Sequence, residues 1–174
     1  RRRAAAPALA GVLLLAAPSA YGVARMASVE AERAAAPTLR VGVLQPNVMI
    51  AEGTDPSTGS ARLLRLQRAT AALEAAGAEL VAWPESAYPY PIGRDRTGDL
   101  GGPLAVRAHG VRGPAVFGAM TEAGGCARWN TVVAMEATGE FAMADKVALV
   151  PFGETVPLWH LLPPLRERYA CPGL

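Results

Sequence analysis

The sequence predicts an α/β domain preceded by an apolar N-terminal helix. Three observations support this prediction: an uncharged run from Ala4 to Ala24, a strand–helix–strand order between residues 38 and 85, and two hairpin-like connections farther along the chain. A strand–helix–strand order is typical of a sheet whose faces are covered by helices. Adjacent hairpins indicate that this sheet is mixed and not purely parallel.

Composition limits the classes of function. The 174 residues are 51% hydrophobic and 18% charged, which suits a chain that buries one ordinary core. A net charge of +2, with several arginines gathered at the extreme N-terminus, gives no basic patch and argues against nucleic acid as a partner. Cys126 and Cys171 show no metal-ligand spacing, and the two histidines stand apart, so we expect neither a metal nor another cofactor.

The apolar run at the N-terminus has two leading interpretations. With a rise of about 1.5 Å per residue it nearly spans a hydrocarbon core of about 30 Å, although Pro7 and Pro18 are each expected to disturb a helix. A basic start, an apolar core and small residues before a cleavage point also describe a secretory signal peptide. Both interpretations place the rest of the chain outside the cytoplasm, and a buried soluble helix ranks below them. The polar, Ala-rich residues 27–37 are interpreted as a connector.

The elements of the α/β layer follow in order. Leu39 to Leu44 form a β-rich apolar run that stops at a Gln-Pro-Asn turn signal. Residues 61–78 repeat apolar positions at helical spacing and stop at Gly77. One face of this helix is predicted to hold Leu63, Leu66, Thr70 and Leu73, while Arg62, Arg65 and Arg68 lie mostly away from it.

Further strands are predicted on both sides of the middle of the chain. The stretch "ELVAWPE" (residues 79–85) indicates a second short strand, with Glu85 at its carboxyl end. Residues 114–120 and 128–137 indicate two more strands, and "ATGE" is a turn before residues 141–154.

Three ionisable residues interrupt these apolar runs: Glu85, Lys146 and Glu154. Each has an ordinary explanation, as a solvated loop residue, a strand-edge lysine or a loop carboxylate. The ends of buried strands are, however, where active-site groups of α/β sheets gather. Together the three residues therefore form a candidate site.

Four motifs resemble the carbon-nitrogen hydrolase (nitrilase) superfamily in order and approximate spacing. They are "RVGVLQPNV", "LVAWPESAYPY", "WNTVVAMEATGE" and "DKVALVPFGETVPL", and the resemblance covers roughly residues 38–164. More narrowly, "WPESA" and the pattern K-x-x-L-V-P-F-G-E-x-V-P-L are similar to the apolipoprotein N-acyltransferases of bacterial envelopes. The lysine motif is specific, whereas Pro-Glu after a strand is weak by itself.

The resemblance implies a fold and a place in the cell. The implied fold is a nitrilase-like α-β-β-α sandwich, present in part, over residues 38–174, with C-terminal truncation. It follows one transmembrane helix over residues 1–26, which favours the membrane helix over the signal peptide. The implied location is the bacterial inner membrane, with the nitrilase-like domain on the extracytoplasmic side. Because the chain begins with Arg1 and stops at "YACPGL" without a recognisable final element, we expect a fragment.

The resemblance also implies roles for the three ionisable residues. Glu85 matches the general base, Lys146 the group that stabilises the tetrahedral oxyanion, and Glu154 a further glutamate that positions substrate or neighbouring side chains. This chemistry uses a cysteine thiol, whose pKa of about 8.5 makes an adjacent base useful. The strand and Trp83-Pro84 are expected to hold the Glu85 carboxylate in a poorly solvated position where it accepts a proton.

The expected nucleophile is missing from the matching positions. Cys171 lies in a Pro/Gly-containing stretch with no apolar strand before it, and Cys126 precedes the lysine motif. The nucleophilic cysteine is therefore expected beyond Leu174.

The function implied is transfer of an acyl chain from a phospholipid to the N-terminal diacylglyceryl-cysteine of a lipoprotein, through a cysteine thioester. Phospholipid, lipoprotein and membrane are then the partners. Two alternatives stay open, namely a soluble or secreted amidase of the wider nitrilase group and a catalytically inactive nitrilase-like interaction domain. The fragment alone is expected to be inactive.

Overall fold

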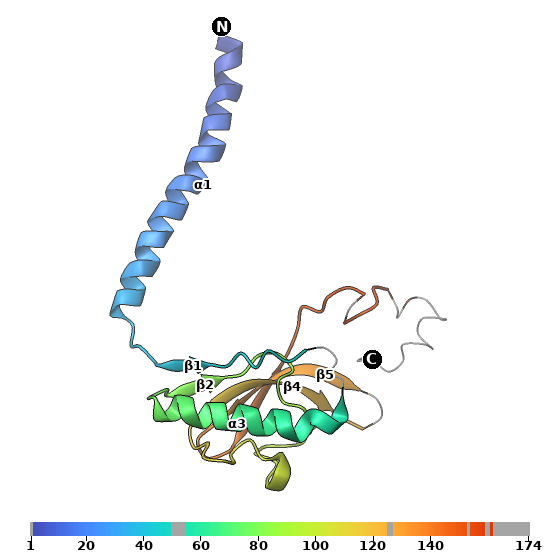
Figure 1. Ribbon diagram of the computed structural model, residues 1–174. Coiled ribbons are helices and arrows are strands. Elements are labelled where there is room, and N and C mark those ends of the chain that lie inside the picture. The colour runs from blue at the N-terminus through green and yellow to red at the C-terminus, as the bar shows by residue number, and fades with distance from the viewer. Residues whose placement is uncertain (1, 50–54, 125–126, 153, 159–160, 162–174) are drawn as a thin grey trace. The chain divides into compact units, whose positions relative to one another are not determined.

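The computed structural model describes residues 2–49, 55–124, 127–152, 154–158 and 161 (Figure 1). The chain divides into two units, one ending at Thr38 and one beginning at Leu39. The first unit contains helix α1 (Arg2–Ala35), and the second contains the sheet and helix α3 (Gly59–Ala75). Short 3-10 turns, η1 (Pro56–Thr58) and η2 (Gly102–Leu104), complete the described helical elements.

Helix α1 is continuous through both Pro7 and Pro18. Pro18 lacks a backbone N–H donor, so one hydrogen bond of the helix is lost there, yet the helix continues on both sides. Its part from Ala10 to Ala35 is long and apolar enough to cross a membrane, with a mean hydropathy of 1.4 in its most apolar window and no burial. The predicted division into a span over residues 1–26 and a connector over 27–37 stays a prediction.

The sheet is mixed, as the hairpin-like connections predicted. Its strands are β1 (Val41–Val43), β2 (Leu80–Ala82), β3 (Ile92–Gly93), β4 (Ala115–Glu122), β5 (Arg128–Met135) and β6 (Phe141–Asp145). They lie in the order β1-β2-β4-β5-β6, and β3 also pairs with β4. Pairing is parallel from β1 through β2 to β4 and between β3 and β4, then antiparallel from β4 through β5 to β6.

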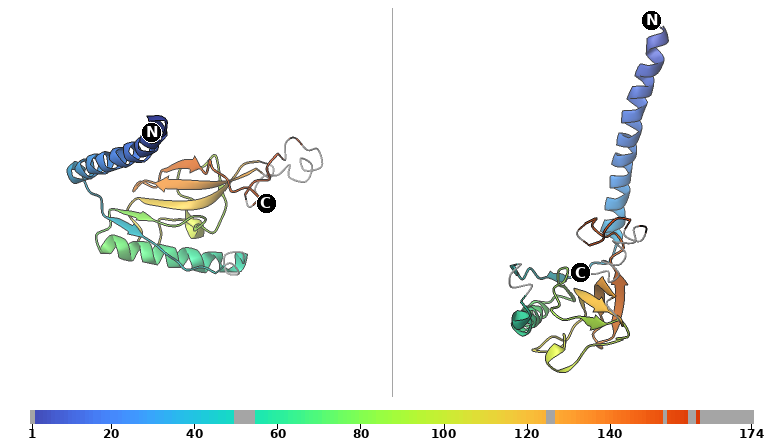
Figure 2. Two further views of the ribbon diagram at one scale, coloured as in Figure 1. Left: turned by 90° about the horizontal axis from the view of Figure 1, so that it is seen from above. Right: turned by 90° about the vertical axis from the view of Figure 1, so that its right-hand side faces the viewer.

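Helix α3 lies along one face of the sheet, as the views in Figure 2 show. The predicted apolar face is confirmed for Leu63, Leu66 and Thr70, which are all buried. Arg62 is a correction, because it is only 9% exposed and not turned away from the core. It lies one turn before Leu66 on the same side of the helix, where a long aliphatic stem packs well. Gly77, with a φ of +95°, follows the helix end where a stop was predicted.

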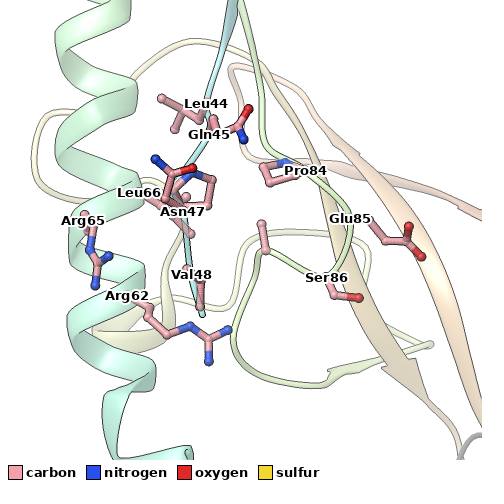
Figure 3. A pocket seen from close by; sticks show the side chains of 12 residues that line it. Leu44, Gln45, Asn47, Val48, Arg62, Arg65, Leu66, Pro84, Glu85 and Ser86 are labelled. Carbon is pink, nitrogen blue, oxygen red and sulfur yellow. The ribbon is translucent and has the colours of Figure 1, made fainter. Parts of the chain in front are cut away.

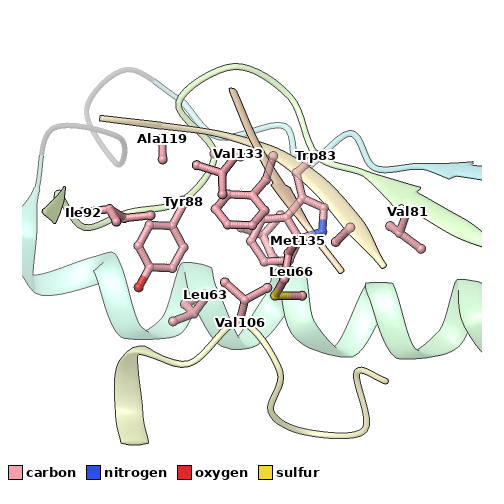
Figure 4. Close-up of a cluster of buried hydrophobic side chains, with 13 residues drawn as sticks. Leu63, Leu66, Val81, Trp83, Tyr88, Ile92, Val106, Ala119, Val133 and Met135 are labelled. Carbon is pink, nitrogen blue, oxygen red and sulfur yellow. The ribbon is translucent and has the colours of Figure 1, made fainter. Parts of the chain in front are cut away.

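The hydrophobic core fills the space between α3 and strands β2, β4 and β5 (Figure 4). Alternate residues of β4 and β5 face it, because successive side chains of a strand point to opposite faces. Its buried members are Leu63, Leu66, Val81, Trp83, Ala87, Tyr88, Ile92, Val106, Ala115, Phe117, Ala119, Val133 and Met135. The other face of β5 and β6 is largely exposed in the described part of the chain, including Val132 and Ala144. The described residues thus build one sheet with one helix layer.

Candidate functional site

Trp83 fixes the segment that carries Glu85. It follows β2 directly, is buried, and its backbone N–H donates to the Val116 carbonyl at 2.8 Å. Its indole Nε1–H donates to Oγ1 of Thr70 on α3 at 2.8 Å, and its ring lies 5.3 Å from that of Phe117. Because Trp83 is bonded to both the helix and the sheet, the backbone at Glu85, two residues later, has little freedom to move.

Gly118 lets the backbone around Glu85 lie directly on β4. A Cβ at position 118 would meet the backbone N of Ser86 at 2.5 Å, Cα of Glu85 at 2.6 Å and the Pro84 carbonyl oxygen at 2.8 Å. The Gly118 N–H donates to that same carbonyl at 3.2 Å. Ser86 has a φ of +52°, a conformation that is uncommon for residues other than glycine. The turn that orients the Glu85 side chain thus requires a residue without a side chain at position 118.

Lys146 and Asn130 come from the two neighbouring strands. Lys146 is the residue after β6, and its backbone N–H donates to the Asn130 carbonyl at 2.8 Å. The Asn130 amide Nδ2 donates to Oε1 of Glu85, so β5 contributes a direct contact to the site. Asn130 and Lys146 lie on the sheet face opposite the core, because the adjacent Thr131 is buried in the core face.

The structure brings together the three residues that the sequence singled out. The Lys146 ammonium Nζ lies 3.2 Å from Oε1 of Glu85 and 2.7 Å from Oε1 of Glu154. The second oxygen of Glu154 accepts the Val150 N–H at 2.8 Å, and the Glu154 N–H donates back to the Val150 carbonyl, also at 2.8 Å. One cation is therefore shared by two carboxylates from segments far apart in sequence.

The ion pairs shift the pKa values of Lys146 and Glu154 in the directions that keep both residues charged. The hydrogen bond to Glu154, and then the one to Glu85, raises the pKa of Lys146 above its usual 10.5. The hydrogen bond from Lys146, helped by the Val150 N–H, lowers the pKa of Glu154 below its usual 4.5. Lys146 is consequently an ammonium at neutral pH and is suited to stabilise negative charge, not to accept a proton.

The solvation of Glu85 differs from the expectation. Its side chain is 61% exposed in the described structure, compared with 31% for Lys146 and 27% for Glu154. The carboxylate therefore meets solvent over most of its surface. The expectation of a poorly solvated position is therefore wrong for this structure.

Two cavities meet at the Glu85 segment. One, of about 340 Å³, lies on the site side and is lined by Trp83, Glu85, Gly118, Asn130 and Lys146 among others. The other, of about 500 Å³, lies between α3 and residues 44–48 and 84–87. Figure 3 shows the Glu85 carboxylate pointing away from this second cavity. The Glu85 carboxylate thus belongs to the smaller cavity, where Lys146 also lies.

Sequence reasoning missed Asn130 and Gly118. Asn130 stands inside the quoted "WNTVV" stretch, and a polar residue early in an apolar strand was the available signal. Gly118 stands in the middle of a strand, which is typical of a place where another backbone approaches closely. Cys126 and Cys171 lie outside the described residues. Among the described residues, no group of three or more His, Cys, Asp and Glu side chains is placed to hold a metal ion.

Two curated proteins match most of the chain in sequence. The apolipoprotein N-acyltransferase of Azotobacter vinelandii is 37% identical over 172 residues, covering 90% of this chain and 30% of that protein. The apolipoprotein N-acyltransferase of Gloeobacter violaceus is 31% identical over 131 residues, covering 75% of this chain and 25% of that protein. The chain therefore spans between a quarter and a third of the length of these relatives, and the resemblance indicated by the motifs is confirmed.

Solved structures of amidases resemble part of the chain. An amidase from Nesterenkonia sp. gives a TM-score of 0.46 at 20% identity, covering 65% of this chain and 44% of that one. A crystal structure of an N-terminal amidase with a Gln-Gly peptide gives 0.45 at 18% identity, covering 64% and 28%. No protein-family model matches the chain.

Proposed function

We propose that this chain is the catalytic-site part of an apolipoprotein N-acyltransferase, together with the membrane helix that precedes it. Two relatives of that name, at 31% and 37% identity over most of the chain, support the assignment. The observation that carries it is the shared cation: Lys146 lies between Glu85 and Glu154 at the positions where the motifs placed a base, an oxyanion partner and a further glutamate.

The first half of the proposed reaction forms a thioester. A cysteine thiol beyond Leu174 gives its proton to Glu85 and attacks the ester carbonyl of a phospholipid. Negative charge then develops on the carbonyl oxygen, and the Lys146 ammonium is the fixed positive charge available to stabilise it. When the intermediate collapses, the C–O bond to the glycerol breaks, and the lysophospholipid leaves with the proton held by Glu85.

The second half transfers the acyl chain. The α-amino group of a lipoprotein's diacylglyceryl-cysteine attacks the thioester carbonyl, and Glu85 accepts one of its protons. The C–S bond breaks as the amide forms, and the thiolate recovers the proton from Glu85. Asn130 and Lys146 both hold Oε1 of Glu85, so the other carboxylate oxygen is the one left to exchange these protons. Glu154 keeps Lys146 in place and charged throughout.

The proposed donor is a phospholipid and the proposed acceptor is a protein that carries a diacylglyceryl group, so the reaction requires a membrane location. One apolar helix, from Ala10 to Ala35, is present in the described chain. We place that helix in the bacterial inner membrane, with the unit from Leu39 onward on the extracytoplasmic side. Arginines at the N-terminal end of the helix agree with a cytoplasmic start.

The test removes the two proposed catalytic charges in the full-length protein. Glu85→Gln keeps the shape of the side chain without its basicity, and Lys146→Met keeps most of the stem without the charge. Each is expected to lower the rate of acyl transfer by about 10²-fold or more. Glu122→Gln, which removes a carboxylate from the exposed pair with Arg128, is the matched control and should leave the rate unchanged. Wild-type rates for either site variant would refute the assignment.

A further inference from the structure

A closed ring of hydrogen bonds joins three strands beside the candidate site, on the core face of the sheet. Oδ1 of Asp145 accepts from Arg94 Nη1 and from Thr131 Oγ1, both at 2.8 Å. The Thr131 hydroxyl lies 2.7 Å from that of Thr121, and Arg94 Nη1 lies 3.1 Å from the same Thr121 hydroxyl. The ring thus links β4, β5 and β6 to the residue that follows β3.

The ring is built to stay closed. Thr121 and Thr131 are fully buried, and among the described residues their hydroxyls bond within the network or to nearby backbone. The guanidinium of Arg94 lies 4.3 Å over the Trp129 ring, and its backbone N–H donates to the Glu122 carbonyl at 3.0 Å. Opening the ring would leave buried polar groups without partners, which costs more than an exposed hydrogen bond does.

Two members of the ring are direct chain neighbours of two members of the site. Thr131 follows Asn130 on β5, and Asp145 precedes Lys146 at the end of β6. Thr131 and Asp145 are partners in the β5–β6 register, and the next backbone hydrogen bond of that pair runs from Lys146 to Asn130. Because successive residues point to opposite faces, the Thr131–Asp145 bond lies beneath the Asn130–Lys146 pair.

We infer that the ring of Arg94, Thr121, Thr131 and Asp145 positions Lys146 and Asn130 against Glu85. This inference rests on the proposed function and adds four positioning residues to it. Lys146 is the first residue beyond the ladder, where a strand end would otherwise fray. The carboxylate of Asp145, bonded to β5 and to Arg94, holds the backbone there. Displacement of a charged group by about 1 Å is enough to slow a reaction by about 10²-fold.

The experiment uses the full-length protein and measures the steady-state rate of acyl transfer from a labelled phospholipid to a lipoprotein acceptor. Thr131→Val keeps the shape but breaks the ring, whereas Thr131→Ser keeps the hydroxyl. The valine variant is expected to lower kcat per folded molecule by about 10-fold or more, with KM for the phospholipid nearly unchanged. The serine variant should restore most of the rate. Thr138→Val, in the exposed turn between β5 and β6, is the matched control and should behave as wild type.

Several results would overturn the inference. A wild-type kcat for folded Thr131→Val, a serine variant as slow as the valine variant, or a change confined to KM would each contradict it. If Thr131→Val does not fold, Arg94→Gln opens the ring at a partly exposed corner, and a wild-type kcat for that variant contradicts the inference equally. Lys146→Met separates the two claims: if it is inactive while Thr131→Val has a normal rate, only the inference fails.

Discussion

Two carboxylates from different segments of the chain bind the Lys146 ammonium, keep it charged and fix its position. Glu85 comes from the turn after β2, and Glu154 from the loop that follows Lys146 itself. The Val150 N–H orients Glu154, and Asn130 orients Glu85. A lysine in this setting stays charged and stays in one place, and both properties are required of a group that stabilises an oxyanion.

The Lys146–Glu154 pair should make stability depend on pH in a defined way. The lowered pKa of Glu154 means that its contribution is present above pH 4.5 and is lost as pH falls through the lower folded value. The raised pKa of Lys146 means that its contribution is present below pH 10.5 and is lost as pH rises through the higher folded value. The difference in Tm between wild type and Glu154→Gln should therefore be greatest between these limits. A difference that grows as the solution is acidified would contradict the pairing.

Gly118→Ala tests whether the close approach of the Glu85 turn to β4 matters. The added methyl group would meet backbone atoms of Pro84, Glu85 and Ser86 below 3.0 Å, so the turn must move. We expect loss of acyl transfer by about 10-fold or more, together with a lower Tm. Gly124→Ala is the control, because a Cβ there meets nothing within 4 Å. Equal activity of the two variants would show that the turn tolerates displacement.

The sequence predicted the charged members of the site but not its supports. Glu85, Lys146 and Glu154 stood out because a charge interrupting an apolar run is visible in one dimension. Asn130 and Gly118 did not, because their importance comes from which backbone lies across the sheet from them. The exposure of Glu85 could not be predicted from the sequence either, because its solvation depends on what lies over the face of β5 and β6 opposite the core.

A buried hydrogen bond joins helix α3 to Trp83, the residue that follows strand β2. Trp83 donates to Thr70, whose hydroxyl in turn donates to the Leu66 carbonyl one turn earlier in the helix. Such a contact fixes how the helix lies along the sheet, because apolar packing alone is not directional. The contact lies two residues before Glu85.

Thr70→Val should weaken this junction. The valine fills the same space but leaves the buried indole N–H without its acceptor, so we expect a loss of about 1–3 kcal/mol in the free energy of unfolding. Thr70→Ser keeps the hydroxyl and should lose much less. Denaturant unfolding of the two variants gives the comparison. A valine variant as stable as the serine variant would mean that the indole finds another partner.

Element order was predictable where periodicity was clear. The strand–helix–strand order and the mixed sheet were predicted from apolar runs, hairpin-like turns and apolar residues at helical spacing. The helix end was predicted from Gly77. The burial of Arg62 was missed because its charge argued for solvent, while the position one turn before Leu66 and the long stem decided otherwise. Strands β1 and β2 are also shorter than the apolar runs that predicted them.

The complete protein should be held in the membrane by helix α1. Expressed with its upstream sequence, it is expected to stay in the membrane pellet through alkaline carbonate washing, because the Ala10–Ala35 helix is apolar and unburied within the chain. A signal peptide predicts the opposite result, namely release of a processed species that starts near Met26. The N-terminal sequence of the product distinguishes the two.

The central claim is that Glu85, Lys146 and Glu154 serve a thioester formed on a cysteine beyond Leu174. The most direct measurement is labelling with a radioactive phospholipid, followed by release with hydroxylamine. Full-length protein and its Cys171→Ala variant should both carry the labelled acyl group, Lys146→Met should acquire it about 10²-fold or more slowly, and the 174-residue chain should carry none. Labelling of the 174-residue chain that disappears with Cys171→Ala, or undiminished labelling of Lys146→Met, would contradict the account.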